Sequence, residues 1–589
     1  MEIINNLKKV FKISGEYRKH FILIIITSII QIIIGIVLPL YTANQIVQLS
    51  ENIFEQLIYT SLMILLISLL NEINEFIMSI ACRKFRMGTI KNLQIRLGKD
   101  ILKIRERDIQ KNGTGTFIER LTNDTDKMAD MFTHGTGYIA RTLMNSGIFV
   151  AIFIINKYVF LYYFIVAIIL TSLYLLKTNK VGKLDVVYRK QRDKVSSLVG
   201  ELVRGDKDLK MLSAKKTFLS KLNVEINDNI SKDYKRRFID VLYLLIIRMI
   251  TDLFSFLLIL LLIYLIKNNI LTIPLAVALF TYRTNIMTNF MHNISLLLDK
   301  IKEFNVSTNR VFAVIENKEF KKENFGTEVH IEIDGNFEFK NVSFSYDDYK
   351  VLDNMSFKIN NGETVAFVGK SGTGKSTIFN LLGKLYDVNE GEILIDGINI
   401  NKLNEDSIRG NITMISQNPY IFNMSIRDNF KLIKEDITDE EIIKTLKLTC
   451  LYDFVSSIPN GLDTIIGEGG TNLSGGQKQR LAIARALVQK TKIILFDEAT
   501  SALDNETQAD IQTAIDNLKG EYTVLIIAHR LSTIKHSDRI LLVDNGKIRS
   551  EGTHNQLLKD DNLYKKLYEN EIEKQWYCWY KRGGRKNYY

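Results

Sequence analysis

Long apolar runs fill the first half of the chain, and short apolar runs between glycine-rich turns fill the second. Residues 21–50 contain no Asp, Glu, Lys or Arg. Because a helix of about 20 apolar residues crosses the hydrocarbon core of a membrane, this run predicts a spanning helix, at 21–46. Five more predominantly apolar runs are long enough to span: 57–82, 138–156, 158–176, 239–266 and 271–298. Residues 1–318 are therefore predicted to form a membrane domain of six spanning helices.

Basic residues concentrate in the two long loops between the apolar runs. Residues 83–140 carry twelve Lys or Arg and residues 177–238 carry seventeen, whereas 49–56 carries none. Because such loops stay in the cytoplasm, we expect a multi-pass protein of the cytoplasmic membrane whose N-terminus and second half are cytoplasmic. The net charge of +11 lies largely beside lipid-facing segments, so no nucleic-acid partner is expected. Cys82, Cys450 and Cys578 fit no metal spacing or disulfide framework.

Several polar side chains interrupt the apolar runs. A charge at membrane depth costs at least about 2.5 kcal/mol on insertion scales, and therefore usually faces the protein interior or water. Structural ion pairs between helices and a polar translocation cavity both remain open; Arg248 and Asp252, four residues apart, could pair. We expect at least two of five charged residues to face the interior: Glu72, Arg141, Arg248, Asp252 and Arg283. Glu75, Asn285 and Asn289 are three further polar residues of interest in these runs.

A phosphate-binding loop follows a predicted strand at 363–368. The segment fits G-x-x-x-x-G-K-[ST] and is followed by a predicted helix, which is the context this motif requires. Its glycines let backbone N–H groups turn toward the β-phosphate of a nucleotide. Lys375 would reach the β- and γ-phosphates, and Ser376 would ligate Mg²⁺. The predicted nucleotide-binding residues here are Gly369, Lys370, Ser371, Gly372, Thr373, Gly374, Lys375, Ser376 and Thr377.

A second apolar strand, at 492–496, ends in Asp497 and Glu498. Asp497 can hold Mg²⁺, directly or through water, and Glu498 can polarise the attacking water as a general base. Between the two strands, Ser474, Gly475, Gly476 and Gln477 open a predicted helix and offer a second anion site. Two phosphate-binding motifs in one chain favour a sandwich in which two chains share each ATP.

These motifs together resemble the ATP-binding cassette (ABC) family, and specifically a half-transporter with an exporter-type membrane domain. Residues 473–477 match the signature sequence of this family. The resemblance implies adenine stacking by Tyr346, contact of Gln417 with Mg²⁺ and the membrane domain, and a γ-phosphate contact by His529. It also implies a loop that crosses the dimer interface, with Asp504. The expected catalytic residues are Glu498, His529 and Gln417, and the expected metal ligands are Ser376, Gln417 and Asp497.

The resemblance extends to domain organisation. It implies a multidomain membrane protein, in which an all-α domain at 1–318 precedes an α/β P-loop ATPase domain at 330–570. Residues 115–126 and 201–212 resemble the turns that contact the ATPase domains as coupling helices. Ile465 stands where the family usually has a second acidic residue, and Gly469 stands where it usually has an arginine. The aromatic and basic tail at 571–589 matches nothing in the family and is expected to be a disordered end.

The expected function is ATP-driven export of a peptide, drug-like or lipid-like amphiphile by a homodimer, through alternating access, with ATP and Mg²⁺ as cofactors. A heterodimer remains open. Two other functions also remain open: import by an exporter-shaped member, and a non-transporting sensor or channel regulator. No protease domain precedes the first predicted span, so a built-in leader peptidase is not expected. The sequence does not identify the substrate.

Overall fold

The computed structural model describes residues 2–50, 53–330, 332–467, 470, 472–497, 509, 512–513, 515–527 and 535–570. The chain divides into two compact units. One comprises Met1–Leu102 and Asn112–Phe320, and the other comprises Lys103–Lys111 and Lys321–Tyr589. We call them the membrane unit and the ATP-binding unit.

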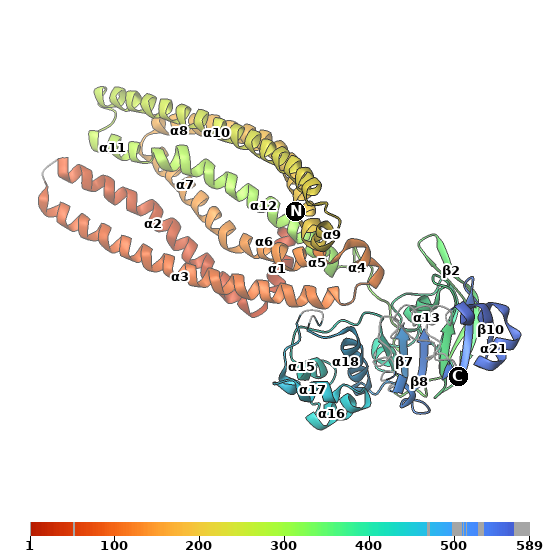
Figure 1. Cartoon of the computed structure of the whole chain (residues 1–589). Helices are drawn as coiled ribbons and strands as arrows, with labels where there is room; N and C mark the ends of the chain where they lie inside the picture. The colour runs from red at the N-terminus through yellow and green to blue at the C-terminus, as the bar shows by residue number, and fades with distance from the viewer. Residues whose placement is uncertain are drawn as a thin grey trace. The chain divides into compact units, whose positions relative to one another are not determined.

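The membrane unit is built of helices (Figure 1). Five helices in the described part of the chain are long and apolar enough to cross a membrane. Among the described residues, three π-helical turns interrupt the regular α-helical hydrogen bonding: η2 (Arg120–Asp124), η3 (Met131–Gly135) and η4 (Asn285–Phe290). The α-helices are α1 (Glu2–Ile13), α2 (Arg18–Ser50), α3 (Phe54–Ile101), α5 (Thr114–Glu119), α6 (Thr125–Asp130), α7 (Thr136–Ile155), α8 (Lys157–Arg204), α9 (Asp206–Met211), α10 (Lys215–Lys267), α11 (Ile273–Thr281) and α12 (Met291–Ile315).

Residues 271–298, predicted as one span, do not form one continuous helix. They divide into the nine-residue α11, the π-helical η4 and the start of α12. Within η4, the Asn289 side chain donates to Asn285 Oδ1 at 3.3 Å. The polar residues noted in this run thus coincide with its interruption, and π-helical turns often occur at functional sites. The count of six spans therefore stays a prediction.

Neighbouring helices form antiparallel pairs, α2 with α3 and α8 with α10 (Figure 1). Asn156 separates α7 from α8, because its side chain accepts hydrogen bonds from the backbone N–H groups of Tyr158 and Val159. Glycines allow α2 and α7 to approach closely. A Cβ on Gly35 would lie 2.1 Å from Met144 Sδ, and one on Gly147 would lie 2.5 Å from Ile36 Cδ1. Small residues at such crossings are typical of membrane helix pairs.

The described part of the ATP-binding unit contains two sheets. An antiparallel sheet has the order β2-β1-β4-β5, and a six-stranded sheet has the order β10-β9-β3-β8-β7-β6. In the second sheet only β10 is antiparallel to its neighbour. The strands are β1 (Phe337–Tyr346), β2 (Tyr349–Ile359), β3 (Thr364–Val368), β4 (Glu390–Ile395), β5 (Ile398–Asn399), β6 (Ile412–Ile415), β7 (Ile493–Asp497), β8 (Thr523–Ile527), β9 (Arg539–Asp544) and β10 (Lys547–Gly552).

The two faces of the six-stranded sheet pack in different hydrophobic cores, because alternate side chains of the parallel strands point to opposite faces. In β3, Val365 and Phe367 pack with α13 (Lys375–Leu382) and the antiparallel sheet, whereas Ala366 and Val368 pack with α18 (Gly475–Val488). Because successive strand side chains point to opposite faces, α13 and α18 cover opposite sides of the sheet. A third core joins part of α18 to helices α15–α17. Other α-helices among the described residues of this unit are α14 (Glu405–Arg409), α15 (Ile426–Lys431), α16 (Asp439–Leu448), α17 (Tyr452–Ser457) and α21 (His554–Asp560).

The segment 103–111, which follows α3, belongs to the ATP-binding unit. It contains most of α4 (Glu106–Asn112). Glu323 N donates to Lys103 O at 2.8 Å, Lys321 N donates to Asp108 Oδ2 at 2.9 Å, and Arg105 pairs with Asp387 at 3.4 Å. The predicted coupling segments at 115–126 and 201–212 lie in the membrane unit. Their coupling role stays a prediction.

Candidate functional site

The phosphate-binding loop joins the fully buried β3 to α13. Gly374, the residue before the helix, has φ +100°, and a Cβ there would also lie 2.6 Å from Leu352 Cδ2. A Cβ on Gly369 would lie 2.3 Å from the backbone oxygen of Val543. Both positions therefore require glycine, for backbone conformation at one and close approach at both. The predicted sequence of strand, glycine loop and helix is present.

Lys375 and Thr373 organise the interior of this loop. The Lys375 side chain is buried, and its Nζ donates to Gly369 O at 2.9 Å and to Lys370 O at 2.8 Å. Thr373 Oγ1 also donates to Lys370 O, at 2.9 Å. The ammonium group thus lies inside the loop at the N-terminus of α13. A helix N-terminus and a cation together form a site for phosphate oxygens.

Asp497 meets the loop at the end of β7. Ser376 Oγ donates to Asp497 Oδ1 at 3.0 Å, so two predicted metal ligands from residues 121 positions apart are adjacent. A hydroxyl and a carboxylate are oxygen ligands of the kind that Mg²⁺ prefers. The residues therefore fit a magnesium ion, which would lie at the phosphates of a nucleotide in the loop. Glu498 follows directly but lies outside the described residues.

The remaining predicted residues of this edge follow neighbouring strands. Register pairs Phe367 of β3 with Ile527 of β8, and Ile527 with Asp497 of β7. The strand β8 therefore ends between the loop and Asp497, and the predicted His529 comes two residues later, outside the described residues. Gln417 follows the end of β6 and is exposed. Carboxyl ends of parallel strands are where ligands bind in such sheets.

Tyr346 lies beside the first turns of α13. Its hydroxyl accepts a hydrogen bond from Asn380 Nδ2 at 3.3 Å and contacts Thr377 Oγ1 at 3.5 Å. Its ring packs edge-on against Phe344 and Tyr386, with centroids 4.8 and 5.1 Å away. The predicted adenine-stacking residue is thus held next to the phosphate loop. Arg107 of α4 pairs with the adjacent Asp347, a contact that the sequence did not predict.

The signature residues begin α18. Ser474 Oγ accepts from Gln477 N at 3.2 Å, and Ser474 N donates to Gln477 Oε1 at 2.9 Å, which is a capping box. Gly475 and Gly476 form the first helical turn between them. This helix covers the opposite face of the sheet from α13. Asp504, the predicted interface residue, lies outside the described residues, as does Gly469.

In the membrane unit, three of the polar residues singled out from sequence, Glu75, Arg141 and Asn289, line two neighbouring pockets. Glu75 and Arg141, with Gln31, line both a pocket of about 480 Å³ and one of about 360 Å³. We call the larger one the arginine pocket, because Arg83, Arg86 and Arg141 line it, and the smaller one the amide pocket. The amide pocket is lined by Gln31, Ile32, Glu75, Ala140, Arg141, Met144, Asn145, Asn289, His292 and Asn293.

Four residues that line the amide pocket were not predicted from the sequence: Gln31, Asn145, His292 and Asn293. Spacing could have indicated two of them, because residues four apart lie on the same face of a helix. Arg141 and Asn145 are four residues apart, as are Asn289 and Asn293. By contrast, Arg248 and Asp252 form no ion pair in the described structure, although their spacing allows one. Of the five charged residues expected inside, Arg141 lines a described pocket, so the expectation of at least two stays a prediction.

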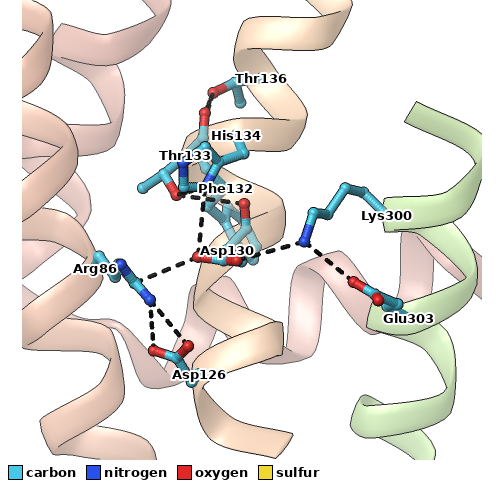
Figure 2. Close-up of polar contacts among 9 residues, drawn as sticks. All are labelled: Arg86, Asp126, Asp130, Phe132, Thr133, His134, Thr136, Lys300 and Glu303. Atoms are coloured by element: carbon cyan, nitrogen blue, oxygen red, sulfur yellow. Dashed lines mark hydrogen bonds and ion pairs between the residues drawn. The ribbon is translucent and has the colours of Figure 1, made fainter. Parts of the chain in front are cut away.

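An ion-pair network connects α3, α6, η3 and α12 beside the arginine pocket (Figure 2). Arg86 of α3 donates to both carboxylate oxygens of Asp126, at 2.8 and 2.9 Å, and its Nε lies 3.3 Å from Asp130 Oδ1. Lys300 of α12 lies 3.5 Å from Asp130 Oδ2 and 3.1 Å from Glu303. His134 Nδ1 lies 3.4 Å from Asp130. Asp130 is therefore surrounded by three basic groups from three elements.

Comparisons with known proteins agree with this organisation. Family models match residues 21–291 as an ABC transporter transmembrane region and residues 352–501 as an ABC transporter. An ATP-dependent lipid A-core flippase from Pasteurella multocida is 31% identical over 522 residues, 87% of this chain and 88% of that protein. Another, from Haemophilus influenzae, is 48% identical over 237 residues, but this match spans only 40% of each protein.

A solved structure of a bacterial Atm1-family ABC exporter with ATP bound has the same fold, with TM-score 0.82 and 25% identity. The match covers 93% of this chain and 99% of that one. Three findings thus lead to one assignment: the helical unit, the phosphate loop with its neighbouring carboxylate, and a relative matched along most of its length. The chain belongs to the ABC transporter family, as an exporter-type half-transporter that joins a transmembrane region to an ATP-hydrolysing domain.

Proposed function

We propose that two copies of this chain form an ATP-driven pump that exports an amphiphile through alternating access. The observation that carries the proposal is the contact of Ser376 with Asp497 beside the buried Lys375. It supplies a phosphate cradle and a pair of oxygen ligands in a chain that also has long apolar helices.

Each predicted residue has a role in this proposal. Lys375 binds the β- and γ-phosphates, and Tyr346 holds the adenine. Ser376 and Asp497, with Gln417, would hold Mg²⁺, which when bound neutralises phosphate charge. Glu498 accepts a proton from the attacking water and His529 contacts the γ-phosphate, since both follow strands that end beside the loop.

The proposed dimer completes each ATP site with Ser474–Gln477 of the partner subunit, and places Asp504 at the interface. Support comes from the location of α13 and α18 on opposite faces of one sheet. Every expected motif of the ATP site itself is intact in the sequence, so two identical chains would build two equivalent sites. Symmetric pairs are also the commonest oligomers.

Export of an amphiphile is supported by the relatives, two of which are named as lipid A-core flippases, and by the polar pockets of the membrane unit. The charge of the long loops supports a cytoplasmic location for the ATP-binding unit. Closure of the two ATP-binding units on ATP would supply the differential affinity that switches the membrane helices.

Flux in sealed vesicles tests this function. The purified chain would be reconstituted without any other gene product, and ATP added outside would reach only subunits with their ATP-binding units facing outward. We expect ATP-dependent movement of a fluorescent amphiphile away from the side of the ATP-binding unit, and none with Lys375→Ala. Movement toward that side would instead indicate an importer. ATP hydrolysis without flux of any amphiphile would indicate a regulator. Activity that requires a second chain would refute the homodimer.

A further inference from the structure

The amide pocket contains a polar group that the folded chain leaves unpaired. Asn145 of α7 is fully buried, and neither its Nδ2 nor its Oδ1 has a hydrogen-bond partner in the described structure. Two other buried asparagines of this unit do have partners: Asn74 donates to Thr27 O at 3.0 Å, and Asn156 caps α8. An unpaired buried amide costs free energy, and such groups in native structures call for an explanation.

The charges around Asn145 disfavour a purely ionic ligand. The pocket is lined by one carboxylate, Glu75, and one guanidinium, Arg141, and Gln31 Nε2 already donates to Glu75 at 3.3 Å. An anionic ligand would pair with Arg141 but lie against Glu75. In the adjoining arginine pocket, Asp126 and Asp130 already hold Arg86 (Figure 2).

The free atoms of Asn145 specify the chemistry of the missing partner. Its Oδ1 needs a donor and its Nδ2 needs an acceptor. A phosphate or carboxylate lacks the donor, and an ammonium lacks the acceptor. A hydroxyl supplies both from one oxygen, so a compact head with several hydroxyls can satisfy Asn145, Glu75 and Arg141 together within about 360 Å³.

An apolar pocket adjoins the same elements. It has a volume of about 500 Å³ and is lined by Ser146, Phe149, Phe160, Phe164, Ala167, Ile168, Thr171, Ser172 and Phe290. We call it the aromatic pocket. Two elements line both pockets. From α7, Asn145 lines the amide pocket and Phe149 the aromatic pocket; from η4, Asn289 lines the amide pocket and Phe290 the aromatic pocket. Polar and apolar surfaces for the two ends of one amphiphile thus lie on the same two elements.

We propose that the amide pocket binds the neutral, hydroxyl-bearing head group of an amphiphile, and that Asn145 determines this specificity. The proposal rests on the proposed transport function, whose substrate class it defines. The aromatic pocket receives the hydrocarbon part of the same molecule.

Three probes with one tail separate head-group classes: dodecyl maltoside, dodecyl phosphate and dodecyltrimethylammonium. The full chain in nanodiscs would be titrated with each, and both ATP hydrolysis and the apparent melting temperature without nucleotide would be recorded. We expect the maltoside to stimulate hydrolysis and raise the melting temperature at lower concentrations than the ionic probes. Asn145→Leu should raise the half-saturating maltoside concentration about tenfold, the equivalent of one lost hydrogen bond.

The probe-free melting temperature separates this role from a structural one. Asn145→Leu removes an unpaired group and should raise this temperature. The matched control Asn74→Leu removes a paired group outside the pocket and should lower it, without changing the order of the probes. A stronger response to the phosphate probe, to the ammonium probe or to a neutral dodecyl-linked peptide than to the maltoside would overturn the proposal. So would a lower melting temperature of Asn145→Leu together with an unchanged response to the maltoside. If the wild type hydrolyses no ATP, the transport function fails, while the melting shifts still test the pocket.

Discussion

Lys375 in the phosphate loop and Asn145 in the membrane unit are both buried polar side chains, yet their surroundings differ. The loop itself supplies carbonyl oxygens to Lys375 at 2.8 and 2.9 Å. The described structure supplies no partner to Asn145. Nucleotide binding therefore uses a cradle that is organised before the ligand arrives. The membrane unit leaves an amide whose partner must come from the cargo or from water.

The ATP-binding unit offers the largest expected effect. Glu498→Gln should lower ATP turnover by about 10²–10⁴-fold, because a general base is lost, and should leave the phosphate cradle unchanged. ATP binding measured with a fluorescent analogue should stay near that of the wild type, and dimers with trapped nucleotide should accumulate. Near-normal hydrolysis by the purified variant would show that Glu498 is not the base.

Lys375→Ala should instead weaken binding itself. Loss of a hydrogen-bonded charge of this kind corresponds to about 1.5–3 kcal/mol, or roughly a tenfold to hundredfold rise in the dissociation constant for ATP. Lys370→Ala is the matched control, because that side chain is exposed and its backbone oxygen is retained. Equal losses of affinity in the two variants would argue against a special role for Lys375.

The network around Asp130 joins opposite charges in ion pairs within the membrane unit, whereas the neutral amide of Asn145 has no partner in the described structure. Asp130→Asn removes the charge that Arg86 and Lys300 face, and should destabilise the protein by about 1–3 kcal/mol. Asp206→Asn breaks the exposed pair with Lys210 and should change stability by less than about 0.5 kcal/mol. Thermal melting of both variants in detergent provides the comparison, and similar melting temperatures would contradict it.

The smallest effect concerns α21. Burial, with a contribution from nearby Lys535, lowers the pKa of His554 from its ordinary 6.5, and its Nδ1 lies 2.8 Å from Tyr564 Oη. The unfolded chain then binds the proton more tightly. The contribution of the neutral His554 to the free energy of unfolding is therefore complete above about pH 6.5. This contribution is lost as the pH falls through the lower pKa that His554 has in the folded state.

Hydrogen exchange of the α21 amides should accordingly become faster as the pH falls from about 7.5 to 5.5, after correction for intrinsic rates. His554→Gln removes the titrating group and should flatten this dependence. An unchanged dependence in that variant would assign the effect to another group.

The sequence by itself determined the chemistry of the phosphate loop, because the parts of this loop are contiguous. The residues 363–377 contain the strand, the glycine positions, the lysine and the hydroxyl, so local backbone geometry and hydrogen bonding suffice to define the loop. The capping box of Ser474 and Gln477 is equally local. The five long apolar helices follow from length and composition alone, since the membrane imposes its thickness on them.

Only the tertiary structure decided which polar residues of the membrane unit share a pocket. Gln31, Glu75, Asn145 and His292 come from four helices, and their meeting depends on long-range packing, such as the close approach of Gly35 to Met144. The interruption of the last apolar run by η4 and the docking of 103–111 on the ATP-binding unit also required the fold. Periodicity shows that a helix has an apolar face, but the partner that buries each polar side chain is chosen by residues far away in the chain.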